Sequence, residues 1–195
     1  MPRLTSLSLA VVLGALAIAA PASAAKKKPD AAPCPDRTFS RVFSAFHDRS
    51  LYTPAPDGDF EAGAVGWSLT GGASVVDESS SILLGDALGG RSLELADGAS
   101  AVSPDICVTK GFPSFRFVTR GPGVVRVAVL YREGRVKKAG RVRAGAAWRV
   151  SRKVSLAQGR FRVKRGRTAN VQLRFTASGG PVRVDDVYVD PRFRG

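Results

Sequence analysis

The fold class is decided by the stretch VVRVAVLYR at residues 124–132. Every second side chain in it is apolar, and these side chains are Val125, Val127, Val129 and Tyr131. The positions between them carry Arg126, Ala128, Leu130 and Arg132. A period of two places one set on each face of a β-strand. Residues 170–176, NVQLRFT, repeat the pattern with Arg174 on the polar side. Both stretches therefore predict strands with one apolar face and one arginine-bearing face.

The chain from Phe60 onward shows the same kind of short alternating segment between glycine-rich turns. Examples are Leu93 and Leu95, Ile106 and Val108, and Phe115 and Phe117. Many strands with no long helix between them favour an antiparallel sandwich over a parallel α/β sheet. We therefore expect an all-β antiparallel sandwich over residues 57–195. Its last strand, 182–189, is expected to place Val182, Val184, Asp186 and Tyr188 on one face.

Residues 1–24 have the three parts of a secretory signal peptide. Arg3 precedes an apolar run from Leu7 to Ala20, and small residues end the segment at Ala24. The run is shorter than a membrane span of about 20 residues. The pattern predicts export, to the extracellular space or the cell envelope, of a mature chain of 171 residues without a transmembrane segment. An uncleaved N-terminal anchor is the alternative.

Residues 25–56 are predicted to form a leader and an N-terminal extension to the sandwich. Phenylalanines at helical spacing predict a short helix over 39–48, with their rings in the core. The only cysteines, Cys34 and Cys107, are expected to form one disulfide, as suits an exported protein. This bond would attach the extension to the sandwich.

Charge is unevenly distributed along this chain, whose net charge is +14. Residues 30–105 carry 12 acidic against 4 basic side chains, whereas residues 126–174 carry 16 basic against one acidic. Such a field attracts polyanions and is weakened by salt. Two interpretations remain open: a dedicated polyanion-binding surface, or arginines that only solvate the strands. Nucleic acid is expected to bind only nonspecifically, because the basic residues are not accompanied by a known nucleic-acid recognition motif.

Two motifs resemble the ends of a galactose-binding-like jelly roll, the fold of many carbohydrate-binding modules. They are the stretch DGDFEAGAVGW at 57–67 and VDDVYV at 184–189. The whole chain is also similar to small secreted proteins of high-GC bacteria. The jelly-roll resemblance implies a structural calcium between the first and last strands, a cation that prefers oxygen ligands. Its side-chain ligands would be Glu61 and Asp186, with Asp59 and Asp185 as further candidates; alternatively these residues cap turns or pair with arginines.

Aromatic side chains give the candidate sugar contacts. Phe60 and Trp67 are expected in the core. Trp148 could either stack on a sugar ring or close the edge of the core, and Tyr52 and Tyr131 are weaker candidates of the same kind. The predicted ligand-binding set is therefore Trp148 and Tyr131 with the strand arginines Arg126, Arg132 and Arg174.

Catalytic motifs are missing from the sequence. It has no nucleophile elbow and no phosphate-binding loop, and His47 is the only histidine. Asp185 and Asp186 are adjacent, so strand alternation would send them to opposite faces and away from a shared glycosidase site. We therefore expect no enzyme and no required cofactor. The sequence predicts a module that binds extracellular or cell-wall polymers, with a protein-interaction domain of the envelope as the alternative; it does not specify an oligomeric state.

Overall fold

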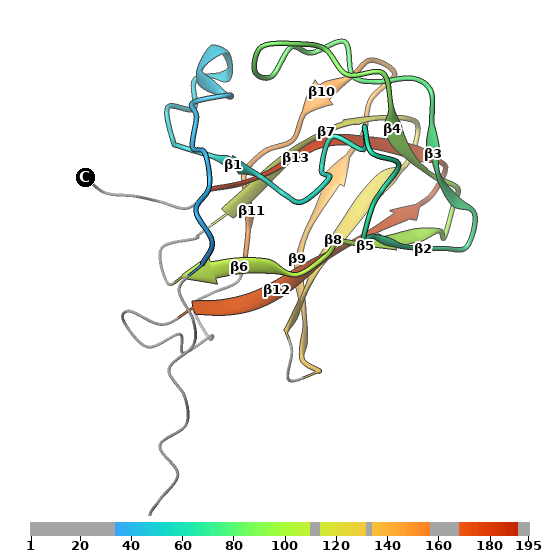
Figure 1. Ribbon diagram of the computed structural model, residues 1–195. Helices are drawn as coiled ribbons and strands as arrows, with labels where there is room; N and C mark the ends of the chain where they lie inside the picture. Colours follow the sequence, from blue (N-terminus) through green and yellow to red (C-terminus); the bar gives the residue numbers. More distant parts are fainter. Residues whose placement is uncertain (1–33, 110–113, 132–133, 157–167, 191–195) are drawn as a thin grey trace, which may run out of the picture.

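Two antiparallel sheets face each other in the computed structural model, which describes residues 34–109, 114–131, 134–156 and 168–190 (Figure 1). The seven-stranded sheet has the order β10-β7-β13-β4-β3, with β1 paired to β13 and β11 paired to β7. Its strands are β1 (Thr53–Pro54), β3 (Ala73–Val76), β4 (Ser92–Leu95), β7 (Ser114–Arg120), β10 (Arg149–Val150), β11 (Val154–Ser155) and β13 (Val182–Asp190).

The six-stranded sheet has the order β2-β5-β12-β8-β9, and β6 also pairs with β12. Its strands are β2 (Ser68–Thr70), β5 (Ser100–Val102), β6 (Ile106–Thr109), β8 (Val124–Tyr131), β9 (Val136–Arg143) and β12 (Thr168–Ser178). The expected all-β antiparallel sandwich is confirmed. Strand β1 lies within the segment assigned to the extension and pairs with β13, so the extension contributes to the seven-stranded sheet.

The core lies between the sheets, where alternation brings the apolar sides of their strands together. Val125, Val127 and Val129 of β8 are buried there, as the sequence predicts. Phe117 and Phe175, from opposite sheets, meet edge to face with ring centroids 5.2 Å apart. Phe60 and Trp67 belong to the same core, which confirms that prediction.

Strand β13 departs from the expected alternation at Asp186. This residue has a φ of 52°, and the pairing of β13 with β7 shifts register between Asp185 and Tyr188. The extra residue reverses the faces to which the following residues of the strand point, as a β-bulge does. Val187 and Val189 therefore enter the core, and Tyr188 packs on the outer side of the sheet. The prediction that Asp186 and Tyr188 share a face with Val182 and Val184 is wrong beyond the bulge.

The N-terminal extension covers the outer side of the seven-stranded sheet. The helix predicted over 39–48 is wrong: only a 3-10 turn, η1 (Ser44–Phe46), is present. Ser40 instead exchanges two backbone hydrogen bonds with Tyr52, so the segment folds back on itself. Phe43 is buried in a second apolar cluster on this outer side, with Tyr52 and Val118, whereas Phe46 is 38% exposed.

The disulfide between Cys34 and Cys107 is confirmed and joins this extension to β6. The predicted signal peptide, residues 1–24, and the predicted leader, residues 25–33, lie outside the described part of the chain. The structure contains no helix, within its described residues, that is long and apolar enough to cross a membrane.

Candidate binding face

The outward side of the six-stranded sheet is a polar surface built by the strands. Because side chains alternate, the residues between the core positions of β8, β9 and β12 point away from the core. Five of them are basic: Arg126, Lys138, Arg141, Arg143 and Arg174. We call these five residues the basic face. Lys137 is a sixth base of these strands, opposite the core residue Val129. The six strands of the sheet contain no Asp or Glu.

Strand register sets the spacing within the basic face. Arg126 lies directly opposite Arg141 on β9 and opposite Thr176 on β12. Ala128 occupies the next outward position of β8, with Arg174 opposite it on one side and Lys138 on the other. Like charges that are directly opposite on neighbouring strands destabilise a sheet. The Arg126–Arg141 pair therefore destabilises the sheet. An anion bound between the two guanidinium groups would remove this repulsion.

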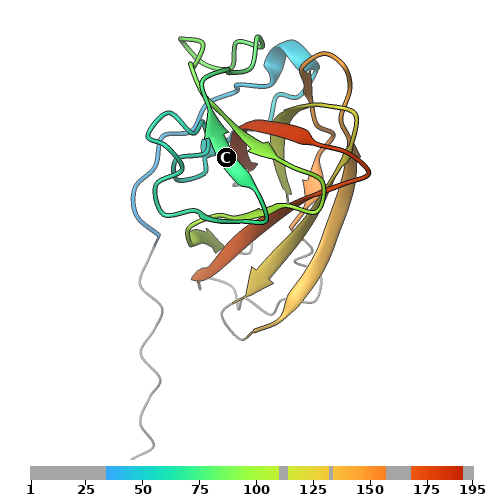
Figure 2. The same cartoon turned by 90° about the vertical axis from the view of Figure 1, so that its right-hand side faces the viewer.

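Solvent reaches this face. Arg126, Lys138, Arg141 and Arg143 are exposed, and Arg174 is half-buried. Within the part of the chain that the structure describes, none of the five forms an ion pair with an acidic side chain. In Figure 2, β9 (orange) and the beginning of the described chain (blue) lie on opposite sides of the molecule. The extension thus covers one sheet and leaves the basic face open.

The outer side of the seven-stranded sheet is organised differently, because a buried ion pair holds the extension onto it. The Asp48 carboxylate lies 3.0 Å from Nη1 of Arg116, and both side chains are at most 10% exposed. The Tyr52 hydroxyl donates to the same carboxylate at 2.7 Å. The Arg116 guanidinium also lies 4.6 Å from the centre of the Phe43 ring. These contacts fill the surface that a ligand would need.

The predicted ligand-binding residues do not form one site. Tyr131 points into the core, where its hydroxyl donates to the Leu156 carbonyl at 2.8 Å. Trp148 precedes β10 on the other sheet, half-buried against the second apolar cluster, and the Arg120 guanidinium lies 5.2 Å from the centre of its ring. Arg132 lies outside the described residues. Only Arg126 and Arg174 lie together, diagonally across β8 and β12.

The four carboxylates predicted to hold calcium lie near one another at the start and end of the sandwich. Burial, followed by the charges of Asp59 and Glu61, raises the pKa of Asp186 to about 7. Burial and the neighbouring Asp186 raise the pKa of Asp185 to about 8, against hydrogen bonds that lower it. Asp186 has a φ of 52° and lies at the bulge, where the regular alternation of β13 is interrupted.

Three of these carboxylates already accept backbone hydrogen bonds, and Asp59 accepts the Glu61 N–H at 3.4 Å. Oε1 of Glu61 accepts the N–H groups of Gly90 and Arg91, both at 2.8 Å. Asp185 accepts the Ser80 N–H at 2.7 Å and the Asp186 N–H at 2.8 Å. Across the described ranges, no group of three or more His, Cys, Asp or Glu side chains is arranged to hold a metal ion. Calcium ligation by Glu61, Asp186, Asp59 and Asp185 therefore stays a prediction.

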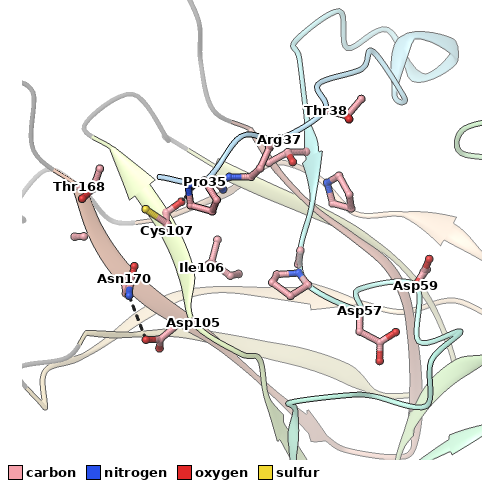
Figure 3. Close-up of a pocket in the computed structure, with 15 residues that line it drawn as sticks. Pro35, Arg37, Thr38, Asp57, Asp59, Asp105, Ile106, Cys107, Thr168 and Asn170 are labelled. Atoms are coloured by element: carbon pink, nitrogen blue, oxygen red, sulfur yellow. Dashed lines mark hydrogen bonds between the residues drawn. The ribbon is translucent and has the colours of Figure 1, made fainter. Parts of the chain in front are cut away.

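Two hollows adjoin the six-stranded sheet on the side of β6. The larger, about 1020 Å³, lies between the extension and the ends of β6 and β12. Figure 3 shows Arg37 and Thr38 at one side of it and Asp105 and Asn170 at another. The smaller, about 280 Å³, is lined by Leu130, Val136 and Gln172 among others and shares Asp105 and Asn170 with the larger. Asn170 donates to the Asp105 carboxylate at 3.3 Å, so this pair separates the two hollows.

The sequence analysis did not identify Asn170, Gln172 or Asp105 as candidate binding residues. Gln172 and Asn170 alternate with the core residues of β12 in the same way as Arg174, and that alternation was the signal that could have found them. Asp105 gave no signal, because its place beside Asn170 depends on the pairing of β6 with β12.

Comparison with known proteins returned solved structures only, since no family model and no curated protein matches the chain. The proposed similarity to proteins of high-GC bacteria therefore gains no support. One similar structure is a family 6 carbohydrate-binding module, 13% identical, with a TM-score of 0.45 over 67% of this chain and 92% of that one. Another is TmCBM61 in complex with β-1,4-galactotriose, 18% identical, with a TM-score of 0.46 over 70% and 96%.

A third similar structure is the arabinose-bound MgGH51 α-L-arabinofuranosidase, 14% identical, with a TM-score of 0.48. The match covers 71% of this chain and 26% of the enzyme. The structural neighbours thus include carbohydrate-binding modules and a glycoside hydrolase.

Proposed function

We propose that this chain is an exported, non-catalytic module that attaches to anionic polysaccharide outside the cell through the basic face. The observation that carries the proposal is the open outer side of the six-stranded sheet, with five outward bases on strands that contain no acid. A flat array of cations suits an extended polymer with repeated negative charges, because each unit of the polymer finds the same kind of partner.

The remaining features support export and binding without catalysis. A disulfide such as Cys34–Cys107 persists in oxidising compartments outside the cytoplasm. His47, the single histidine of the sequence, is exposed on the extension, and no hydrogen bond of its imidazole to another described residue is present. We also propose that the four carboxylates near Asp186 have a structural role and that any calcium they bind stabilises the fold rather than a ligand.

The test is binding of the exported chain to immobilised acidic and neutral polysaccharides at low and high salt. Arg126→Gln/Arg141→Gln removes the directly opposed pair, and Arg49→Gln/Arg149→Gln is the control, since those two arginines are exposed and lie on the extension and the other sheet. We expect the first variant to lose about tenfold in affinity for acidic polymers at low salt, equivalent to about 1.4 kcal/mol, and the control to keep its affinity. Equal losses in the two variants would contradict a role for this face.

A second candidate, a protein-interaction domain of the envelope, is favoured by a different observation. Leu83 and Leu88, in the loop between β3 and β4, are each 55% exposed. Exposed apolar side chains that cluster are characteristic of protein interfaces. Absence of binding to every polysaccharide, together with capture of a defined envelope protein that Leu83→Ser/Leu88→Ser abolishes, would support this candidate instead.

A further inference from the structure

Strand β12 presents two amides and then a cation on its outward side. Asn170, Gln172 and Arg174 follow one another at every second position, so neighbouring members of this series are separated by about 7 Å along the strand. An amide offers both donors and an acceptor, the complement of a hydroxyl group. The series therefore changes from groups that suit neutral hydroxyls to one that suits a negative charge.

The smaller hollow has an apolar floor next to these amides. Leu130 lies opposite Gln172 on one side and opposite Val136 on the other. Val136 is 48% exposed, and Leu130 is half-buried. Apolar side chains flanked by a few polar groups are typical of ligand sites. Such a floor suits the C–H face of a sugar ring.

The hollow adjoins the basic face along β8. The next outward-facing residue of β8, two positions before Leu130, is Ala128. It lies between Arg174 and Lys138 on the neighbouring strands. Ala128 has a small side chain and is buried between these two cations. Arg126 and Arg141 lie one step further along the same strands. An extended chain that lies along β8 would meet the amides and the apolar floor first, and the cations next.

We propose that this composite surface selects a linear acidic polysaccharide, rather than polyanions in general, by reading ring hydroxyls at Asn170 and Gln172 and negative groups at the basic face. The inference rests on the proposed function and specifies its ligand. Asn170 and Gln172 provide the discrimination, because a side-chain amide both donates to and accepts from a ligand hydroxyl. Asp105 and Arg135 line the same hollow with one charge of each sign. A polyanion that has no hydroxyl groups, such as poly-L-glutamate, cannot form that hydrogen bond with the amides.

The experiment compares two kinds of polymer at equal charge concentration with the full exported chain. Polygalacturonate, alginate and hyaluronan carry both carboxylates and hydroxyls, whereas poly-L-glutamate carries carboxylates without hydroxyls. Gln172→Ala tests the hollow, and Ser178→Ala, at the opposite end of β12, is its matched control. Arg126→Gln/Arg141→Gln tests the cations. Thermal unfolding of each variant establishes that it is folded before binding is measured.

We expect at least one acidic polysaccharide to bind about tenfold more tightly than poly-L-glutamate. Gln172→Ala should lower that affinity about fivefold, the size of one lost hydrogen bond, and leave poly-L-glutamate binding unchanged. The arginine variant should weaken both polymers. Equal wild-type affinity for both polymer kinds would overturn this inference and leave the proposed function standing, whatever the variants do. Absence of binding to all four polymers would overturn the proposed function as well.

Discussion

Replacing Asp48 by asparagine tests the contact that holds the N-terminal extension on the sandwich. The carboxylate accepts hydrogen bonds from the Tyr52 hydroxyl, the Ser50 N–H and Arg116, and its second ion pair is with Lys153 at 2.9 Å. Asparagine keeps the shape but removes the charge and turns an NH₂ group toward these donors. Arg116 then remains buried, with the Ser151 carbonyl as its partner.

The expected loss follows from the burial of the pair. Removing one partner of a buried ion pair costs about 3–5 kcal/mol, since the remaining charge is uncompensated. The Lys153 contact adds little, because that side chain is 47% exposed. We therefore expect Asp48→Asn to lower the free energy of unfolding by about 3 kcal/mol, which corresponds to a fall in Tm of about 6–12 °C for a chain of this size.

The assay is urea unfolding at pH 7, followed by tryptophan fluorescence. Asp77→Asn is the matched control: Asp77 pairs with Arg91 at 3.2 Å but is 90% exposed, so its loss should stay below about 0.5 kcal/mol. The double variant Asp48→Leu/Arg116→Met leaves no buried charge unpaired and should recover part of the stability. If Asp48→Asn is no more destabilising than Asp77→Asn, the assignment of the pair as the main anchor of the extension is wrong.

The same carboxylate predicts a response to acid. Burial by itself raises the pKa of Asp48, but hydrogen bonds from Tyr52, Lys153 and Ser50 outweigh burial and hold this pKa well below its usual range. A lowered pKa in the folded state means that the stabilisation is complete above the unfolded-state pKa, about 3.9, and is lost as the pH falls through the folded-state pKa. The wild type should therefore lose stability below about pH 4 more steeply than Asp48→Asn.

Three further perturbations have defined outcomes. Cys34→Ser/Cys107→Ser should lower the free energy of unfolding by about 4 kcal/mol, because the bond closes a loop of 73 residues, and an unchanged urea midpoint would contradict this. Calcium at millimolar concentration should raise the Tm of the wild type but not of Asp186→Asn; no shift in the wild type would contradict calcium ligation. Gly58→Ala should cost about 1–3 kcal/mol in urea unfolding, because its Cβ would lie 2.8 Å from the Val187 carbonyl oxygen, and retained stability would mean that the turn can move.

The sequence alone predicted those parts of the fold that depend only on the alternation of apolar and polar residues within one strand. The faces of β8 and β12 follow directly from every second residue being apolar, so the outward positions of Arg126 and Arg174 could be read from the sequence. The buried positions of Phe60 and Trp67 follow from the size of their apolar side chains.

The errors arose where tertiary contacts override the local pattern. The phenylalanines of 39–48 have helical spacing, yet Phe43 packs on the outer side of a sheet and Ser40 pairs with Tyr52. One residue in the left-handed region, Asp186, reverses the second half of β13. The contact of Trp148 with Arg120, 28 positions earlier in the chain, was likewise not predicted, and a role of Trp148 in sugar binding stays a prediction. Rules based on alternation or spacing within one segment cannot predict contacts with residues that are distant in the sequence.

The covered seven-stranded sheet has a consequence for how the protein would behave in a matrix. In the described part of the chain, one broad side is occupied by the extension and the other bears the cations, so the proposed function places polymer contact on one side of the molecule. A particle of that kind coats a polymer strand in one orientation but cannot bridge two strands. Its accumulation would decorate a polysaccharide network without gelling it or changing its mesh.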